Sequence, residues 1–304
     1  GGMAPLAPAS RGGLAGARRS HPTPTCAPPR ALPRVDLIAT DVDGTLMGSD
    51  HRLPPAHAAA IAAASAAGVP VVVATGKSRG PWAEDLLPAL GLGTPGVFSQ
   101  GCAVHEASGE VRWLVSLDTE MVREVCEFVS ERGIALAAYC GPRMRCLGAP
   151  CALTGRLADF GEEAPWEAGA EELCSLAPQK LLLVFESDEA LAEVRPALEA
   201  TLAGRATTTT AVMGMLEVLP LGSSKGSALE RLLGEMGVDP GHVMAIGDGE
   251  NDVEMLRLCG VAVAMGNAKE LLKREADAVV ASNDDGGFAE AVERFVLAPR
   301  AAAA

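Results

Sequence analysis

The chain has 304 residues, and its hydrophobic (48%) and charged (21%) fractions are typical of a globular protein with one large or two modest domains. Asp and Glu outnumber Lys and Arg by 39 to 25, which gives a net charge of −14. This acidic balance argues against binding to the phosphate backbone of nucleic acid or to an anionic membrane surface. One uncharged stretch, residues 53–76, is rich in Ala, a weak hydrophobe, and is interrupted by Gly and Pro, so we expect no membrane span there.

Residues 1–34 differ in composition from the rest of the chain. They contain five Arg and seven Pro, no acidic residue and no periodic apolar pattern. This composition is typical of an organellar transit peptide, and a disordered basic tail is the alternative. We therefore expect the chloroplast or the mitochondrion if this head directs targeting, and the cytoplasm otherwise.

From residue 35 onward, short apolar runs alternate with helical patterns. The run at 69–75 is rich in β-branched residues, as in a buried parallel strand. A Ser-Gly pair near residue 108 predicts a hairpin turn. We expect strands at 35–40, 69–75 and 96–99, helices at 55–67 and 81–90, and a hairpin joining 103–105 to 111–115.

The middle of the chain has a different pattern. Residues 148–178 are rich in Gly, Pro and acidic residues and predict no clear element. Around them we expect helices at 118–131 and 188–202 and strands at 134–140, 180–186 and 206–211. A mixed α+β domain over residues 117–211 is therefore predicted.

Strands and helices then alternate again. We expect strands at 216–219, 243–246, 261–264 and 278–280, and helices at 225–236, 250–258, 269–275 and 288–296. This βαβα order predicts an α/β fold with a doubly wound parallel sheet. Its core would comprise residues 35–116 and 212–298, with residues 299–304 as a tail.

Polar residues follow three of the predicted strands. They are Asp41-Val-Asp43-Gly44-Thr, Thr75-Gly76-Lys77-Ser, and Gly-Asp248-Gly-Glu-Asn251-Asp252. Ligands of open parallel sheets bind at the carboxyl ends of the strands, so these residues are expected to converge. Four carboxylates placed together repel one another and raise each other's pKa, and a bound divalent cation relieves this repulsion. An all-oxygen ligand set suits magnesium.

The neighbouring residues suit a phosphate group. Gly44 allows close approach of the backbone, and Thr75 and Lys225 can donate to phosphate oxygens. Either acidic motif alone would be typical of a solvated turn. An EF-hand is excluded for both, because the twelfth positions are Arg52 and Cys259 instead of Glu.

Taken together, these motifs resemble the haloacid dehalogenase superfamily of phosphohydrolases. Asp41-Val-Asp43-Gly-Thr is similar to the first motif, Thr75-Gly76 to the second, Lys225-Gly to the third, and the segment from Gly247 to Asp252 to the fourth. The long gap between Thr75 and Lys225 resembles the Cof-type sugar-phosphate phosphatases. This resemblance implies a haloacid dehalogenase-like core with an inserted α+β cap domain at 117–211.

The resemblance also implies a role for each matched residue. Asp41 would be the nucleophile, and Asp43 the general acid and then the general base. The phosphate would be held by Gly44, Thr75, Gly76, Lys225 and Asn251. Magnesium would be bound by the side chains of Asp41 and Asp248 and by the backbone carbonyl of Asp43. Asp252 would either bind the metal through water or orient Lys225.

Two positions depart from the subgroup's pattern. Lys77 replaces the usual Arg, and Gln100 replaces the usual Asn before Gly, so we expect both to contact the body of the substrate. The implied activity is magnesium-dependent hydrolysis of a small phosphorylated metabolite through an aspartyl-phosphate. One alternative is a mutase resembling phosphomannomutase, in which Arg143 and Arg145 of the cap would grip a second phosphate. Another is a non-catalytic protein that binds a phosphate ligand.

Overall fold

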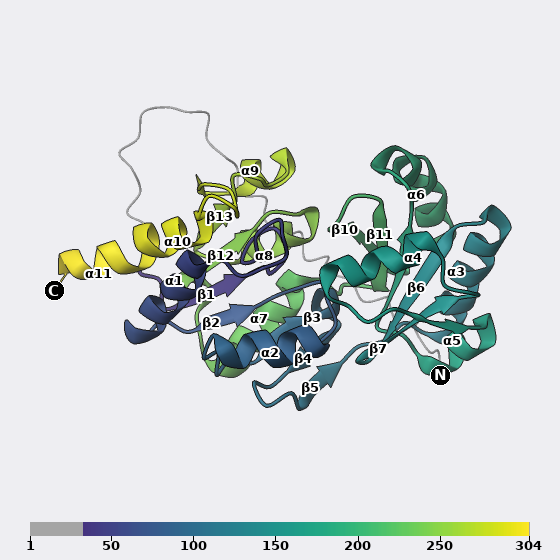
Figure 1. Ribbon diagram of the computed structural model, residues 1–304, viewed down its shortest axis with the longest axis horizontal. Helices are drawn as coiled ribbons and strands as arrows, with labels where there is room; N and C mark the ends of the chain where they lie inside the picture. The colour runs from purple at the N-terminus through teal and green to yellow at the C-terminus, as the bar shows by residue number, and fades with distance from the viewer. Residues whose placement is uncertain (1–32, 304) are drawn as a thin grey trace, which may run out of the picture. The chain divides into compact units, whose positions relative to one another are not determined.

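The computed structural model describes residues 33–303. Its central sheet has five parallel strands in the order β14-β13-β12-β1-β2. These strands are β1 (Leu37–Thr40), β2 (Val71–Val73), β12 (Val243–Gly247), β13 (Val261–Ala264) and β14 (Ala278–Val279). The first and last thirds of the described chain therefore interleave in one sheet, because β1 lies between β2 and β12 (Figure 1). The predicted parallel α/β core is confirmed.

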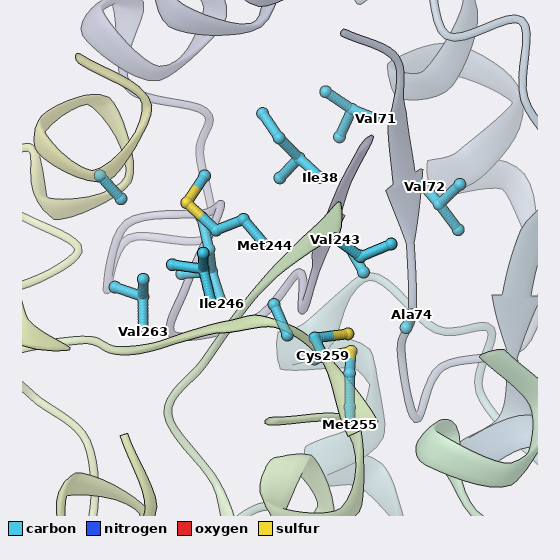
Figure 2. Packing of buried hydrophobic residues seen from close by; sticks show 14 of the residues in the cluster. Ile38, Val71, Val72, Ala74, Val243, Met244, Ile246, Met255, Cys259 and Val263 are labelled. Atoms are coloured by element: carbon cyan, nitrogen blue, oxygen red, sulfur yellow. The ribbon is translucent and has the colours of Figure 1, made fainter. Parts of the chain in front are cut away.

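Helices cover this sheet on both faces. They are α1 (Pro55–Ala66), α2 (Pro81–Ala89), α7 (Lys225–Met236), α8 (Val253–Leu258), α9 (Glu270–Glu275) and α10 (Gly287–Val292). A last helix, α11 (Ala298–Ala303), follows α10 at the end of the chain. Figure 2 shows Ile38 and Met244 on one side of the sheet and Val72 and Met255 on the other. Burial of each such side chain contributes about 1.5–3 kcal/mol to folding.

A small antiparallel sheet extends the core. It is formed by β3 (Gly96–Phe98), β4 (Ala103–His105) and β5 (Val111–Leu114), which include the expected hairpin. A single parallel bridge between Ala74 and Val97 joins β3 to the segment that follows β2. This bridge brings the residues after β3 close to the end of β2.

The inserted cap is built on a second sheet of six strands in the order β10-β11-β9-β6-β7-β8. The strands are β6 (Ala135–Cys140), β7 (Arg143–Leu147), β8 (Trp166–Ala168), β9 (Lys180–Val184), β10 (Ala206–Thr210) and β11 (Met215–Pro220). The cap helices are α3 (Thr119–Arg132), α4 (Ala152–Gly155), α5 (Ala170–Leu176) and α6 (Asp188–Leu202). Helices α3, α5 and α6 pack on one face of the sheet, which leaves Tyr139, Leu182 and Met215 on the other face.

The cap is larger than the sequence predicts. Strand β11 was expected to begin the return to the core, but it pairs antiparallel with β10 and β9 in the cap sheet. Apolar strands look alike in sequence whichever sheet they join, so residues 212–220 were misassigned. Residues 148–178, for which no clear element was predicted, contain α4, a 3₁₀ turn (Arg156–Phe160), β8 and α5. Strand β7 was also missed.

The structure describes the predicted tail of the chain but little of the predicted head. Of the expected head 1–34, all but the last two residues lie outside the described residues. The expected tail 299–304 is helical as far as Ala303, because α11 continues α10 through a π-helical turn (Glu293–Leu297). Within residues 33–303, no helix has the length and apolar character needed to cross a membrane.

Candidate active site

The centre of the site is Asp41, directly after β1. Its side chain is buried, and Oδ1 accepts hydrogen bonds of 2.7 Å from the backbone N–H of Val42 and from Nζ of Lys225. Burial raises the pKa of Asp41 well above its usual value, and the nearby carboxylates of Asp252 and Asp248 raise it further, while Lys225 opposes them. Asp41 is therefore a fixed, partly neutralised carboxylate.

Lys225 is placed by the start of α7. Ser224 caps the helix by accepting a hydrogen bond of 3.0 Å from the N–H of Ser227, so Lys225 occupies the first turn. Gly226 lets α7 pack tightly on α8, because a Cβ at this position would lie 2.6 Å from Cβ of Glu254. The ammonium of Lys225 is fully buried, and burial alone would lower its pKa. The carboxylates of Asp252 and Asp41 outweigh burial and raise that pKa.

Asp252 holds this lysine in place. Its Oδ1 lies 2.7 Å from Nζ of Lys225, and its Oδ2 accepts hydrogen bonds from the N–H groups of Asp248 (2.9 Å) and Gly249 (3.0 Å). Both carboxylate oxygens therefore have protein partners. This arrangement favours the orienting role for Asp252 over direct metal ligation.

The acidic cluster could hold a metal ion. Asp41, Asp248 and Asp252 each place one carboxylate oxygen within 4.8 Å of the others. Burial and the charge of Asp252 raise the pKa of Asp248 to about 7. A divalent cation would favour the ionised forms of these carboxylates, and an all-oxygen donor set fits magnesium. Gly44 has a φ of +73°, and a Cβ there would lie 2.3 Å from Oδ2 of Asp248, so only glycine fits at this position.

Asp43 lies outside this acidic cluster. Its Oδ1 is 3.3 Å from Nζ of Lys77 and 3.9 Å from Nδ1 of His51. About one-fifth of its side chain is exposed, in contrast to the buried Asp41. Asp43 can therefore exchange protons with water or substrate, as a general acid requires. Lys77 lies beside Asp43 and also lines the cavity above the acidic cluster.

Thr75, Gly76 and Gln100 form a compact turn behind the site. Thr75 Oγ1 accepts a hydrogen bond of 3.2 Å from the N–H of Lys77, and the carbonyl of Thr75 accepts one of 3.1 Å from the N–H of Gln100. The side chain of Gln100 is buried, and its Oε1 accepts a hydrogen bond of 3.1 Å from Nδ2 of Asn251.

This placement differs from the expected contact between Gln100 and the substrate. Ser99 and Gln100 both have left-handed backbone angles, with φ of 48° and 57°. Gln100 therefore lies under Gly76, where a Cβ would be 2.5 Å from Nε2 of Gln100. Gln100 supports the phosphate-site candidates Gly76 and Asn251 and does not line the cavity that contains Asp41.

Arg143 and Arg145 also lie elsewhere than expected. In β7 they flank Met144, which pairs with Tyr139 on the cavity-facing side of the cap sheet. Side chains alternate along a strand, so both arginines are on the opposite face. Each guanidinium lies about 6 Å from the ring of Trp166, at 6.0 and 5.8 Å. Neither arginine is in position to grip a second phosphate in this cavity.

A cavity of about 440 Å³ joins the acidic cluster to the cap. Its volume is in the usual range for small-molecule sites. The cap contributes a mainly apolar wall made of Tyr139, Leu157, Phe160, Leu182, Val212 and Met215.

Three charged cap residues at this cavity were missed by sequence analysis. Glu162 accepts hydrogen bonds from the N–H (2.8 Å) and Oγ (2.6 Å) of Ser78, and burial raises its pKa against the effect of these bonds. Lys180 donates a hydrogen bond of 2.6 Å to the carbonyl of Gly76 and one of 2.7 Å to Glu217. A charged residue inside an apolar strand, as at Lys180 and Glu217, was the available signal.

Comparison with known proteins agrees with this geometry. The sequence model of the haloacid dehalogenase-like hydrolases matches residues 38–292. The "Endoribonuclease YBEY, chloroplastic" of Arabidopsis thaliana is 35% identical over 87% of this chain, but the chain spans only 47% of that protein. An HMP-PP phosphatase of Cronobacter sakazakii is 30% identical over 79% of this chain and 87% of its own length.

A solved structure also matches the fold. A phosphatase of the haloalkanoate enzyme superfamily from Bacteroides thetaiotaomicron is 26% identical, covers 90% of this chain and 99% of its own, and superimposes with a TM-score of 0.73. The chain belongs to the haloacid dehalogenase-like hydrolases. The resemblance inferred from the motifs is thus confirmed, as are the capped α/β fold and the enzyme class, a phosphoric monoester hydrolase.

Proposed function

We propose that this chain hydrolyses a small phosphomonoester with the help of Mg²⁺, through a phosphoryl group carried on Asp41. The observation that supports this most strongly concerns Asp41, which lines the cavity. It contacts the buried ammonium of Lys225 and belongs to the acidic cluster with Asp248 and Asp252. Asp41, the carbonyl of Asp43 and Asp248 would hold the metal. When bound, the metal would neutralise charge on the phosphate oxygens.

The first step is phosphoryl transfer to the enzyme. An oxygen of Asp41 attacks phosphorus, and the ester P–O bond breaks. Asp43 gives its proton to the departing oxygen, so an alcohol leaves. Lys225, with Thr75 and Asn251, would stabilise the negative charge on the phosphoryl oxygens.

The second step regenerates the enzyme. Asp43, now ionised, takes a proton from water, and the water oxygen attacks phosphorus. The bond between phosphorus and Asp41 breaks, and inorganic phosphate is released. The partial exposure of Asp43 supports this exchange, because the same carboxyl must meet the leaving group and then water.

The natural substrate and location are further parts of the proposal. An HMP-PP phosphatase and a phosphoglycolate phosphatase of Methanobrevibacter smithii, both 30% identical, act on small phosphorylated metabolites by name. We propose the same class of substrate here. The basic, Pro-rich head and the chloroplastic relative support targeting to the chloroplast. The mutase alternative has no support from Arg143 and Arg145, which face away from the cavity.

The test is release of inorganic phosphate from 4-nitrophenyl phosphate by the purified full chain, with Mg²⁺ and with EDTA. We expect activity with Mg²⁺, none with EDTA, and none in Asp41→Asn. The matched control is Asp85→Asn, at an exposed position in α2. Phosphate release that is independent of metal, or retained in Asp41→Asn, would refute the proposal. A chain without any phosphatase activity would favour the binding-protein alternative.

A further inference from the structure

The cap carries a buried ion pair next to the phosphate site. Lys180 and Glu217 lie on the neighbouring strands β9 and β11, and their side chains are only 2% and 5% exposed. Nζ of Lys180 lies 2.7 Å from Oε1 of Glu217 and 2.6 Å from the carbonyl oxygen of Gly76. It also lies 4.0 Å from the ring centre of Tyr139. The ammonium is therefore fully engaged by protein groups.

The carboxylate of Glu217 is only half engaged. Its Oε2 is shielded from solvent and has no hydrogen-bond partner within residues 33–303. Glu217 nevertheless lines the same cavity as Asp41. Buried polar atoms in proteins nearly always have partners, and a charged acceptor left without one is especially unfavourable. Because Oε2 is covered, the Glu217 side chain would have to turn slightly toward the cavity for a donor on the substrate to satisfy it.

The surroundings of Glu217 limit what that substrate can be. The cap wall beside it is apolar, with Leu182, Met215 and Phe160 among its members. The other charged cap groups at the cavity are already committed, Lys180 to Glu217 and Glu162 to Ser78. Hydroxyls of a leaving group that face this wall would be buried without partners. Polar core residues, among them Asn283 and Asp284, line another part of the cavity. A ring with one suitably placed donor would be matched.

We propose that Glu217 is a specificity-determining residue whose Oε2 accepts a hydrogen bond from the leaving group. The preferred substrate is then a phosphomonoester of an alcohol with a largely apolar ring that carries an N–H or O–H donor. The phosphate lies at Asp41 and the ring lies on the cap wall. This inference rests on the proposed phosphatase function.

The first test uses the unmodified full chain with Mg²⁺. We would compare kcat/KM for benzyl phosphate, its three aminobenzyl isomers and glucose 6-phosphate. A hydrogen bond to a charged acceptor corresponds to about 10- to 100-fold in kcat/KM, so the best aminobenzyl isomer is expected to exceed benzyl phosphate by that factor. Glucose 6-phosphate is expected to be the poorer substrate. Equal values for all aminobenzyl isomers and benzyl phosphate, or a preference for glucose 6-phosphate, would overturn the inference.

The second test replaces Glu217 by Gln. The amide oxygen must face Lys180, so the NH₂ group would face the substrate and could not accept its hydrogen bond. The ratio of kcat/KM between the best aminobenzyl isomer and benzyl phosphate should fall to about one. Glu193→Gln, an exposed position on α6, should keep the original ratio.

The outcomes separate the two proposals. If phosphate is released but the substrate ratio is unchanged in Glu217→Gln, the role of Glu217 is refuted and the phosphatase function stands. If no ester is hydrolysed by the unmodified chain, both proposals fail. A Glu217→Gln protein that does not fold leaves the comparison on the unmodified chain as the deciding result.

Discussion

The pKa of Asp248 predicts a specific dependence of stability on pH when metal is removed. Burial and the charge of Asp252 raise this pKa from 3.8 to about 7 in the folded protein. Between these two values the folded state binds more protons than the unfolded state, so stability falls as pH rises. With one extra proton bound in the folded state, the unfolding free energy falls by about 1.4 kcal/mol for each pH unit. Between about pH 5 and about pH 7, the expected fall is therefore roughly 3 kcal/mol.

The assay is urea unfolding of the full chain in EDTA at about pH 5 and about pH 7.5. We expect the unfolding free energy of the unmodified protein to fall by about 2–3 kcal/mol over this interval. Asp248→Asn should remove the part of this fall that Asp248 contributes, because the amide does not titrate and can still accept the hydrogen bond of the Thr45 hydroxyl. Added Mg²⁺ should restore stability at the higher pH in the unmodified protein and much less in Asp248→Asn.

Two results would refute this reasoning. One is an unfolding free energy in EDTA that does not change between the two pH values. The other is a full pH dependence in Asp248→Asn, which would assign the titration to another group. The pKa of Asp41 is also raised well above its usual value, so the variant is expected to keep the part of the slope that Asp41 contributes.

Three further predictions concern single substitutions. In rapid mixing with 4-nitrophenyl phosphate, Asp43→Asn should show a burst of about one nitrophenolate per site, followed by turnover slowed by about 10²–10⁴-fold, because the attack of water lacks its general base. Asp41→Ala should show no burst, and turnover of Asp43→Asn at the parent rate would contradict the role of Asp43 as general acid and base. Gly226→Ala should lower the free energy of unfolding by about 1–3 kcal/mol, because its Cβ would meet Glu254 at 2.6 Å; an unchanged urea midpoint would contradict this. Gln100→Ala should reduce kcat/KM on all phosphate esters to a similar extent, because its side chain supports the phosphate-site turn; loss on some esters alone would return Gln100 to a substrate contact.

The candidate site could be located from the sequence because its residues follow strands. Asp41 follows β1 and Thr75 follows β2. The rule that parallel strands present their carboxyl ends at one edge places the two residues together. Lys225 and Asp252 could be added because each lies in a recognisable turn before or after an apolar run. Local patterns of this kind can be recognised without knowledge of the rest of the fold.

The cap could not be predicted in the same way. Lys180 meets Gly76 across 104 residues of sequence, and no local pattern encodes such a contact. The face occupied by Arg143 and Arg145 depends on the register of β7, and that strand was not recognised. The sheet to which β11 belongs depends on pairing with β9, and its apolar run would have suited the core equally well.

The contacts of Lys180 and Glu162 with Gly76 and Ser78 have a consequence for the catalytic cycle. All the cap's hydrogen bonds in this group end on the four-residue segment that also carries Thr75. A movement that separates the cap from this segment would therefore loosen the turn around Thr75 at the same time. The turn around Thr75 would then have its phosphate-binding shape only while the cap contacts it. Phosphate would be held tightly with the cap in contact and released when the cap moves away. Because water replaces each broken bond, the net cost of breaking these hydrogen bonds is about 1–3 kcal/mol for each of them.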